Sequence, residues 1–376
     1  MDIGGLSCLY VEFLILENFR NYKELILKPG LLNTFYGKNA QGKTNLIDAI
    51  FFGITGRSYY TEREREAIRW GGSCSRLYFK LREAYRELVI EINLFKNQPK
   101  KVKANGSVVR GYPLGWVGAV LFSPRDINVV QGPPHERRRF MDQEWGPFIP
   151  HYEYNLRQYQ RVVIQKNNLL RESKDRKRLH VDIDIWNQQL SHFGSKILAT
   201  RLSLLKKINP LIRYFFSRLT ENKEGLVIRY NSSLKIEEEM SEKELYNRFL
   251  CAVAALEDEE IARGQTLIGP HKDDVSFLIN GADARVYGSR GQQYTLLLAL
   301  KMAQIEQWKR ECKENPVLLL DDILFDLDSD RRDALLGYVE GNIQTFITTI
   351  DDKALSFCKL DNSKVFIIDN GRIAHY

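Results

Sequence analysis

A glycine-rich segment between an apolar stretch and a helical pattern constrains this chain more than any other feature. Residues 37–44 read GKNAQGKT and fit the pattern GxxxxGK[ST]. Residues 31–36 before it are mostly apolar, as in a short strand, and residues 46–51 after it carry apolar side chains at helical spacing. A loop between a strand and a helix N-terminus directs backbone N–H groups at phosphate. The sequence therefore predicts a P-loop nucleotide site in an α/β fold.

Each loop residue has an expected role toward ATP. The two glycines let the backbone curl around the β-phosphate, Lys43 reaches the β- and γ-phosphates, and the Thr44 hydroxyl serves Mg²⁺. Lys43 is therefore a catalytic candidate as well as a ligand. We expect nucleotide contacts from the whole loop and the next residue, namely Gly37, Lys38, Asn39, Ala40, Gln41, Gly42, Lys43, Thr44 and Asn45.

A pair of acids near the C-terminus completes this site. Residues 317–320 are apolar and lie between Pro316 and Asp321–Asp322, which indicates a buried parallel strand with carboxylates at its end. Asp321 is expected to hold the Mg²⁺ water shell, and Asp322 to orient or deprotonate the attacking water. Asp322 is one methylene shorter than the glutamate usual in ABC-type ATPases. We therefore expect slow hydrolysis of ATP and a protein that uses the nucleotide as a switch rather than as the fuel of a motor.

A third motif lies between the other two. Ser289, Gly291, Gln292 and the next glutamine open a helical pattern, and SxGxQ resembles the signature of ABC-type ATPases. In that arrangement the serine and glycine contact the γ-phosphate held by a second subunit, so each chain carries half of two sites. Lys43 and Ser289 are 246 residues apart (289 − 43), which leaves room for an insertion. A Gly-Ser turn that merely caps an amphipathic helix is the alternative.

These segments, taken in order, resemble the RecF family of SMC-like ATPases along nearly the whole chain. Arg125 departs from the family, which usually has an acid at this position. The resemblance implies an α/β, ABC-type (SMC-like) P-loop ATPase head at 1–142 and 264–376, with a short helical arm inserted at 143–263. It further implies that Gln131 senses the nucleotide and that Arg20 contacts it. The segments that carry the resemblance are residues 16–22, 37–45, 122–124, 137–142, 165–170, 269–274, 288–293 and 320–322.

The resemblance also implies an activity and partners. Members of this family are recombination mediators in which ATP with Mg²⁺ joins two heads into a homodimer. The dimer binds double-stranded DNA and junctions of single- and double-stranded DNA. Together with RecO and RecR it promotes RecA loading, and its ATPase is weak and DNA-dependent. The expected location is the cytoplasm.

Charge points to a polyanion partner without identifying the contacts. The formal net charge is +7, which a solvated surface with no partner would equally explain. Clustered cations would follow the DNA backbone without reading bases. The candidates are Lys100, Lys101 and Lys103 on an expected hairpin, with Arg161 and Lys166 on the arm.

Two other functions share the ATP motifs. A nuclease-associated SMC-like repair ATPase would need a long coiled coil, and sustained heptads are absent. An ABC transporter subunit is disfavoured by the arginine run at 137–139 and by the order of the family segments. The five scattered cysteines indicate a reduced compartment, and no apolar run approaches the roughly 20 residues of a membrane span.

Overall fold

The computed structural model describes residues 7–83, 86–111, 118–146, 149, 151–172, 176–236, 240–325, 327–339, 343–350 and 363–375. The chain forms two compact units. The first comprises Met1–Asp126 and Leu300–Tyr376, and the second comprises Ile127–Ala299. The insertion expected at 143–263 lies inside the second unit, which is larger at both ends.

A mainly parallel sheet forms the base of the first unit. Its strand order is β17-β16-β4-β15-β14-β9, and only β17 runs antiparallel to its neighbour. β15 lies between the strand that enters the P-loop and the strand that carries the acids, so all three end at the same edge. The bounds are β4 Leu32–Tyr36, β9 Ala119–Phe122, β14 Val317–Leu320, β15 Thr345–Thr349, β16 Ser363–Asp369 and β17 Arg372–His375.

An antiparallel sheet of order β3-β2-β5-β6-β7-β8 completes the first unit. Buried and partly buried residues alternate along most of β6, as expected when one face packs on a core. Asn105 and Gly106 have φ of 48° and 83°, which confirms the predicted hairpin turn between β7 and β8. The strands are β2 Tyr10–Phe19, β3 Tyr22–Leu27, β5 Cys74–Glu83, β6 Arg86–Phe95, β7 Lys101–Ala104 and β8 Ser107–Val108.

One apolar core joins both sheets to helix α1, Lys43–Thr55. Leu14 of β2, Phe35 of β4, Ile50 of α1 and Phe79 of β5 are fully buried in it. The other elements described in this unit are short strands, 3₁₀ turns and helices. They are β1 Ser7–Cys8 paired with β13 Glu314–Asn315, the 3₁₀ turns Glu64–Ala67, Pro124–Ile127 and Ile323–Phe325, α9 Ser329–Val339 and the second half of α8 Arg290–Cys312.

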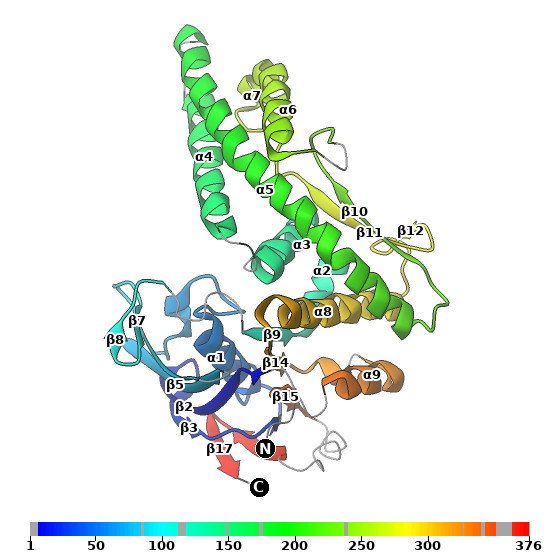
Figure 1. Ribbon diagram of the computed structural model, residues 1–376. Coiled ribbons are helices and arrows are strands. Elements are labelled where there is room, and N and C mark those ends of the chain that lie inside the picture. Colours follow the sequence, from blue (N-terminus) through cyan, green and yellow to red (C-terminus); the bar gives the residue numbers. More distant parts are fainter. Residues whose placement is uncertain are drawn as a thin grey trace. The chain divides into compact units, whose positions relative to one another are not determined.

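The second unit is mostly helical, and α4 and α5 run side by side in it (Figure 1). Its apolar core includes Tyr159 of α4, Leu190 of α5 and Phe249 of α6. The unit also contains a small antiparallel sheet of order β10-β11-β12. The elements are α2 Asn128–Gln131, α3 Pro134–Phe140, a π-helix Met141–Trp145, α4 Tyr152–Glu172, α5 Arg176–Leu219, β10 Leu226–Asn231, α6 Glu242–Ala255, α7 Glu257–Arg263, β11 Asp274–Ile279 and β12 Ala282–Asp283.

Long-range polar contacts explain why the second unit exceeds the expected insertion. Arg137 of α3 donates to both carboxylate oxygens of Asp274 at 2.7 and 2.9 Å. Residues 274–279 of β11 pair with β10, which follows α5 in the chain. These contacts join the segments on both sides of 143–263 to each other and to the strand β10 within that range. Within the described part of the chain, no helix is both long and apolar enough to cross a membrane.

Candidate nucleotide-binding site

The P-loop adopts the conformation that its glycines permit. β4 ends at Tyr36, and α1 begins at Lys43 with Gly42 as its N-cap at φ 115°. A Cβ on Gly42 would lie 2.4 Å from the Asn21 side-chain nitrogen, so both the backbone angle and the space require glycine. The loop thus opens the helix N-terminus toward solvent, as a phosphate site needs.

The turn between β2 and β3 holds the loop in place. Asn21 Nδ2 donates to the Gln41 carbonyl at 3.0 Å, and Asn45 Nδ2 donates to Asn21 Oδ1 at 2.8 Å. The buried Tyr22 hydroxyl donates to the Gly42 carbonyl at 3.0 Å. Sequence reasoning assigned Asn21 and Tyr22 no role of their own, although both belong to the family-like segment 16–22.

Lys43 and Thr44 occupy the positions expected of them. Lys43 is 4% exposed, and its ammonium donates to the carbonyls of Gly37 at 2.8 Å and Lys38 at 3.1 Å. It therefore lies inside the loop, where it places a positive charge. Thr44, the first residue after it, directs its hydroxyl to Asp321 at 3.1 Å.

Asp321, at the end of β14, accepts hydrogen bonds from three hydroxyl groups. Its Oδ1 accepts from Thr44 and, at 2.8 Å, from Thr348, while its Oδ2 accepts from Tyr60 at 2.6 Å. The two predicted Mg²⁺ residues, 277 positions apart, therefore touch. A hydroxyl and a carboxylate are the hard oxygen donors that Mg²⁺ takes beside phosphate and water. Among the described residues no group of three His, Cys, Asp or Glu could hold a metal.

Asp322 lies beside this cluster in a left-handed backbone conformation, with φ of 52°. Its N–H donates to the Thr348 hydroxyl at 2.8 Å, and that hydroxyl also lies 3.3 Å from Asp322 Oδ1. Burial raises the pKa of Asp322; Lys43 opposes this rise and the Asp321 charge adds to it. A carboxylate with a raised pKa is a better proton acceptor, as activating water requires.

The signature-like segment caps helix α8. Ser289 Oγ accepts from the Gln292 N–H at 3.2 Å, and Gln292 Oε1 accepts from the Ser289 N–H at 2.8 Å, with Gly291 in the first turn. The capping alternative is thus realised. It uses the Ser289 oxygen only as an acceptor, so the hydroxyl hydrogen can still be donated to a phosphate. Gln292 Nε2 in turn donates to Glu224 at 2.7 Å.

Gln131 and Arg20 contact protein groups outside the P-loop. Gln131 Nε2 donates to Gln293 Oε1 on α8 at 2.7 Å. The Arg20 guanidinium donates to Asp48 of α1 at 2.5 and 2.9 Å, and Asp48 is fully buried. These contacts leave the expected nucleotide roles of both residues as predictions.

The cations proposed to contact DNA differ in their exposure and in whether they pair with an acid. The prediction that Lys166 contacts DNA is wrong, because its ammonium is fully buried and pairs with Glu260 at 2.5 Å. Lys100 pairs with Glu64 and also donates to the Gly56 carbonyl, and Lys103 pairs with Glu91 at 3.3 Å. Lys101 and Arg161 are exposed and remain candidates.

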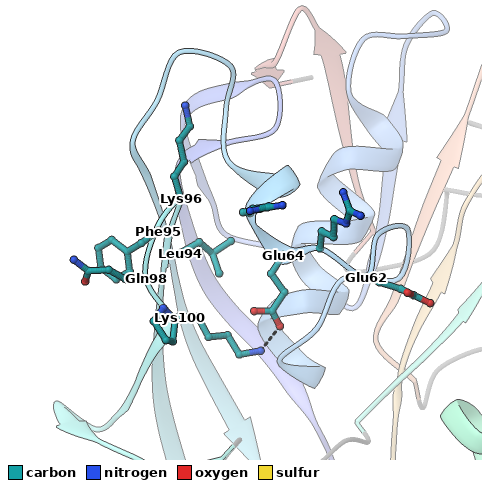
Figure 2. A pocket seen from close by; sticks show the side chains of 10 residues that line it. Glu62, Glu64, Leu94, Phe95, Lys96, Gln98 and Lys100 are labelled. Atoms are coloured by element: carbon teal, nitrogen blue, oxygen red, sulfur yellow. Dashed lines mark hydrogen bonds and ion pairs between the residues drawn. The ribbon is translucent and has the colours of Figure 1, made fainter. Parts of the chain in front are cut away.

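A cavity of about 310 Å³ brings further cations together on the first unit. In Figure 2 the Lys100 ammonium points at Glu64, whereas Lys96 extends away from that pair. The lining combines cations, the acids Glu62 and Glu64, and apolar side chains. The lining residues are Glu62, Arg63, Glu64, Arg65, Leu94, Phe95, Lys96, Gln98, Pro99 and Lys100.

A P-loop, a paired-acid strand and a signature-type capped helix on this mixed α/β head define an ABC-type P-loop ATPase of the SMC-like class. The family model described as AAA domain matches residues 14–314. The chain belongs to the RecF family. It is 46% identical over 332 residues to the DNA replication and repair protein RecF of Pelotomaculum thermopropionicum, covering 88% of this chain and 91% of that protein. The RecF of Acetivibrio thermocellus is 36% identical over 97% of this chain and 99% of its own.

Solved structures agree with this membership. The structure of the recombination mediator protein RecF-ATP in the RecFOR pathway superposes with a TM-score of 0.89 at 30% identity, over 100% of both chains. The Smc head domain of Pyrococcus furiosus superposes with a TM-score of 0.54 at 16% identity, over 98% of this chain and 96% of that one. The second likeness shows the fold alone, and that fold is the SMC-like head that the sequence predicts.

Proposed function

We propose that this protein is an ATP-switched, DNA-binding recombination mediator that acts in the repair of single-strand gaps. The observation that carries the proposal is the meeting of Lys43, Thr44, Asp321 and Asp322 around one P-loop, in a chain whose signature serine caps a separate helix. The ATP-bound relative, a recombination mediator protein of the RecFOR pathway, supports the same role.

Two copies of the chain complete each nucleotide site in this proposal. The loop N–H groups and Lys43 bind the phosphates of ATP, and Ser289 of the second copy donates its hydroxyl to the γ-phosphate. Thr44 and Asp321 would hold Mg²⁺, which neutralises phosphate charge when bound. Asp322 takes the proton of the attacking water. Its short side chain places that water loosely, so turnover is slow and the ATP-bound dimer persists.

DNA binding follows from the charge that the dimer presents. Duplex and junction DNA is held through phosphates by exposed cations, including Lys101, Arg161 and those around the cavity of Figure 2. Binding is sequence-independent because phosphates carry no base information. RecO and RecR then act with the dimer to load RecA, DNA stimulates the weak ATPase, and the protein works in the cytoplasm.

Dimer formation and DNA affinity measured in the same samples test this function. Light scattering and fluorescence anisotropy with duplex and gapped DNA are compared with ATP, with a non-hydrolysable analogue and without nucleotide. We expect ATP and the analogue to produce a dimer and to tighten DNA binding. Lys43→Met should lose about 100-fold in ATP affinity, since roughly 3 kcal/mol of charge-assisted phosphate bonding is removed.

The Lys43→Met variant should also show neither response to ATP while remaining folded, as judged by circular dichroism. An ATP-induced dimer with unchanged DNA affinity would contradict the mediator role. Normal ATP affinity in a folded Lys43→Met protein would contradict the P-loop site itself.

A further inference from the structure

The segment after α1 sends two adjacent tyrosines to two different buried acids. Tyr60 donates to Asp321 Oδ2 at 2.6 Å, whereas the Tyr59 hydroxyl donates to Asp126. Asp321 is one of the residues that bind magnesium in the proposed function. Asp126 accepts from the Ser123 N–H at 2.8 Å and lies 3.5 Å from Lys301. Neighbouring tyrosines of one segment thus serve separate carboxylates.

The backbone that carries Tyr60 is firmly attached to α1. The Tyr59 N–H donates to Asp48 Oδ1 at 2.9 Å, and the Ser58 hydroxyl donates to the same carboxylate. The N–H groups of Tyr60 and Thr61 both donate to Ser58 Oγ at 3.2 Å. Because α1 begins at the P-loop, the position of the Tyr60 ring is tied to the same helix as the phosphate site.

We propose that Tyr60 is a positioning residue for the magnesium site, holding Asp321 in the orientation that lets Thr44 and Asp321 share one cation. The inference rests on the proposed ATP function and goes beyond it, because neither the P-loop nor the paired-acid motif includes this tyrosine. Tyr60 acts through Asp321 and is not itself a ligand.

The distribution of hydrogen bonds on Asp321 carries the inference. Thr44 and Thr348 both donate to Oδ1, so Tyr60 supplies the hydrogen bond to Oδ2. Asp321 is 4% exposed, and a buried carboxylate oxygen without a donor is costly. Without the phenol the carboxylate would turn to find another donor, and Oδ1 would leave Thr44.

A cation restrains the ring that delivers this hydrogen bond. The Arg125 guanidinium lies 5.0 Å from the centre of the Tyr60 ring, and the Tyr59 ring meets it edge-on at 5.4 Å. Fixed donors to a metal-binding carboxylate set how well the metal site is formed, and their loss typically costs about 10- to 100-fold in metal affinity.

The test is the magnesium requirement of ATP binding in Tyr60→Phe, with Tyr59→Phe as the matched control. A fluorescent ATP analogue is titrated in EDTA and at increasing Mg²⁺. In Tyr60→Phe we expect the half-saturating Mg²⁺ concentration to rise about 10- to 100-fold, with the affinity in EDTA within twofold of wild type. Tyr59→Phe should leave both values unchanged, because its hydroxyl reaches Asp126 instead.

Each outcome decides for or against Tyr60. An unchanged magnesium requirement in folded Tyr60→Phe, or an equal rise in Tyr59→Phe, would overturn the inference. If Tyr60→Phe does not fold, Arg125→Ala replaces it, because Arg125 is exposed and its loss frees the ring; a rise in the magnesium requirement supports the inference and no rise overturns it. A wild-type protein that binds no ATP would instead refute the proposed function.

Discussion

Asp322 separates ATP binding from ATP turnover at the scale of a single residue. We expect Asp322→Asn to bind ATP and dimerise normally, because the substitution preserves shape and leaves Lys43, Thr44 and Asp321 in place. Turnover should fall at least about 100-fold, since only the proton-accepting carboxylate is lost. Steady-state phosphate release measures turnover, and Asp258→Asn, an exposed acid of α7, is the control. Undiminished hydrolysis would place the base elsewhere.

The residues of the site were predictable where a local motif specifies them. Lys43, Thr44 and Asp321 follow from short patterns whose flanking elements agree, and the structure brings them together. Tyr60 lies 261 positions from Asp321 and belongs to no such pattern. The assignment of Lys166 to DNA was wrong for the same reason. Its partner Glu260 is 94 positions away, so the local sequence does not show that this lysine is paired. Tertiary pairing of single polar side chains has no signature in local spacing.

At the scale of elements, the strands were predicted more closely than the helices. β14 has the expected bounds because Pro316 and the acid pair Asp321–Asp322 end it abruptly. Apolar spacing in the sequence predicts a helix over 185–205, whereas α5 spans Arg176–Leu219 and passes through Pro210. The same spacing predicts one helix over 243–263, whereas α6 ends at Ala255 and α7 begins two residues later. Helix ends depend on packing as well as propensity, so apolar periodicity alone misplaces them.

A buried histidine makes the second unit sensitive to acid. Burial, followed by the nearby charge of Lys272, lowers the pKa of His271 from 6.5 to about 4, and its Nδ1 shares a 2.7 Å hydrogen bond with the Tyr159 hydroxyl. The unfolded chain therefore binds this proton between about pH 6.5 and 4 while the folded chain does not. The stability that the neutral His271 side chain contributes is fully present above pH 6.5. As the pH falls from 6.5 to about 4, the free energy of unfolding drops by up to about 3 kcal/mol.

The pH dependence of urea unfolding measures this effect. His271→Gln should flatten the fall in the free energy of unfolding between pH 6.5 and 4, whereas His135→Gln, whose side chain is 65% exposed, should leave it unchanged. The same steep fall in the His271 variant would assign the acid sensitivity to other groups.

The contact between Glu224 and Gln292 connects the α5–β10 turn to the signature segment. We expect Glu224→Ala to loosen Gln292 and the Ser289 cap, and so to weaken ATP-driven dimerisation about 10-fold, the equivalent of a charge-assisted bond of roughly 1.5 kcal/mol. ATP binding by the monomer should not change. Light scattering against ATP concentration measures the first effect, and Glu221→Ala, an exposed acid of the same turn, is the matched control. Equal effects of both substitutions would refute a specific role for Glu224.

At the scale of the whole molecule, the order of motifs along the chain was enough to predict the class. The P-loop residue Lys43 lies 246 residues before Ser289 of the signature, whereas the paired acids follow the signature helix closely, and this spacing excludes compact P-loop folds. The limits of the second unit were harder to predict from the sequence, because they depend on long-range pairs such as Arg137 with Asp274. The DNA-binding surface was the hardest feature to predict from the sequence. Charge counts do not reveal which lysines are already paired with acids, as Lys100 and Lys103 are.

The cavity in Figure 2 offers the sharpest test of DNA binding by the assembled protein. Arg63, Arg65 and Lys96 come from two separate segments around it, and Lys100 in the same cavity is held by Glu64. If these three cations meet phosphates, replacing all three with glutamate should weaken binding to every duplex sequence about equally. The slope of log affinity against log salt should fall by about 3, because each phosphate contact contributes roughly 0.9.

The matched control makes the same charge change at Lys23, Lys28 and Lys364, which are exposed on and beside β3 and β16. It alters the net charge equally but leaves the cavity intact, so its salt slope should stay close to that of the wild type. ATP-induced dimerisation should survive in both variants, since neither touches the P-loop or the signature. Because a dimer presents two such surfaces to one duplex, ATP should strengthen DNA binding less in the cavity variant than in the control. Equal slopes in the two variants would mean that only net charge matters and that DNA binds elsewhere.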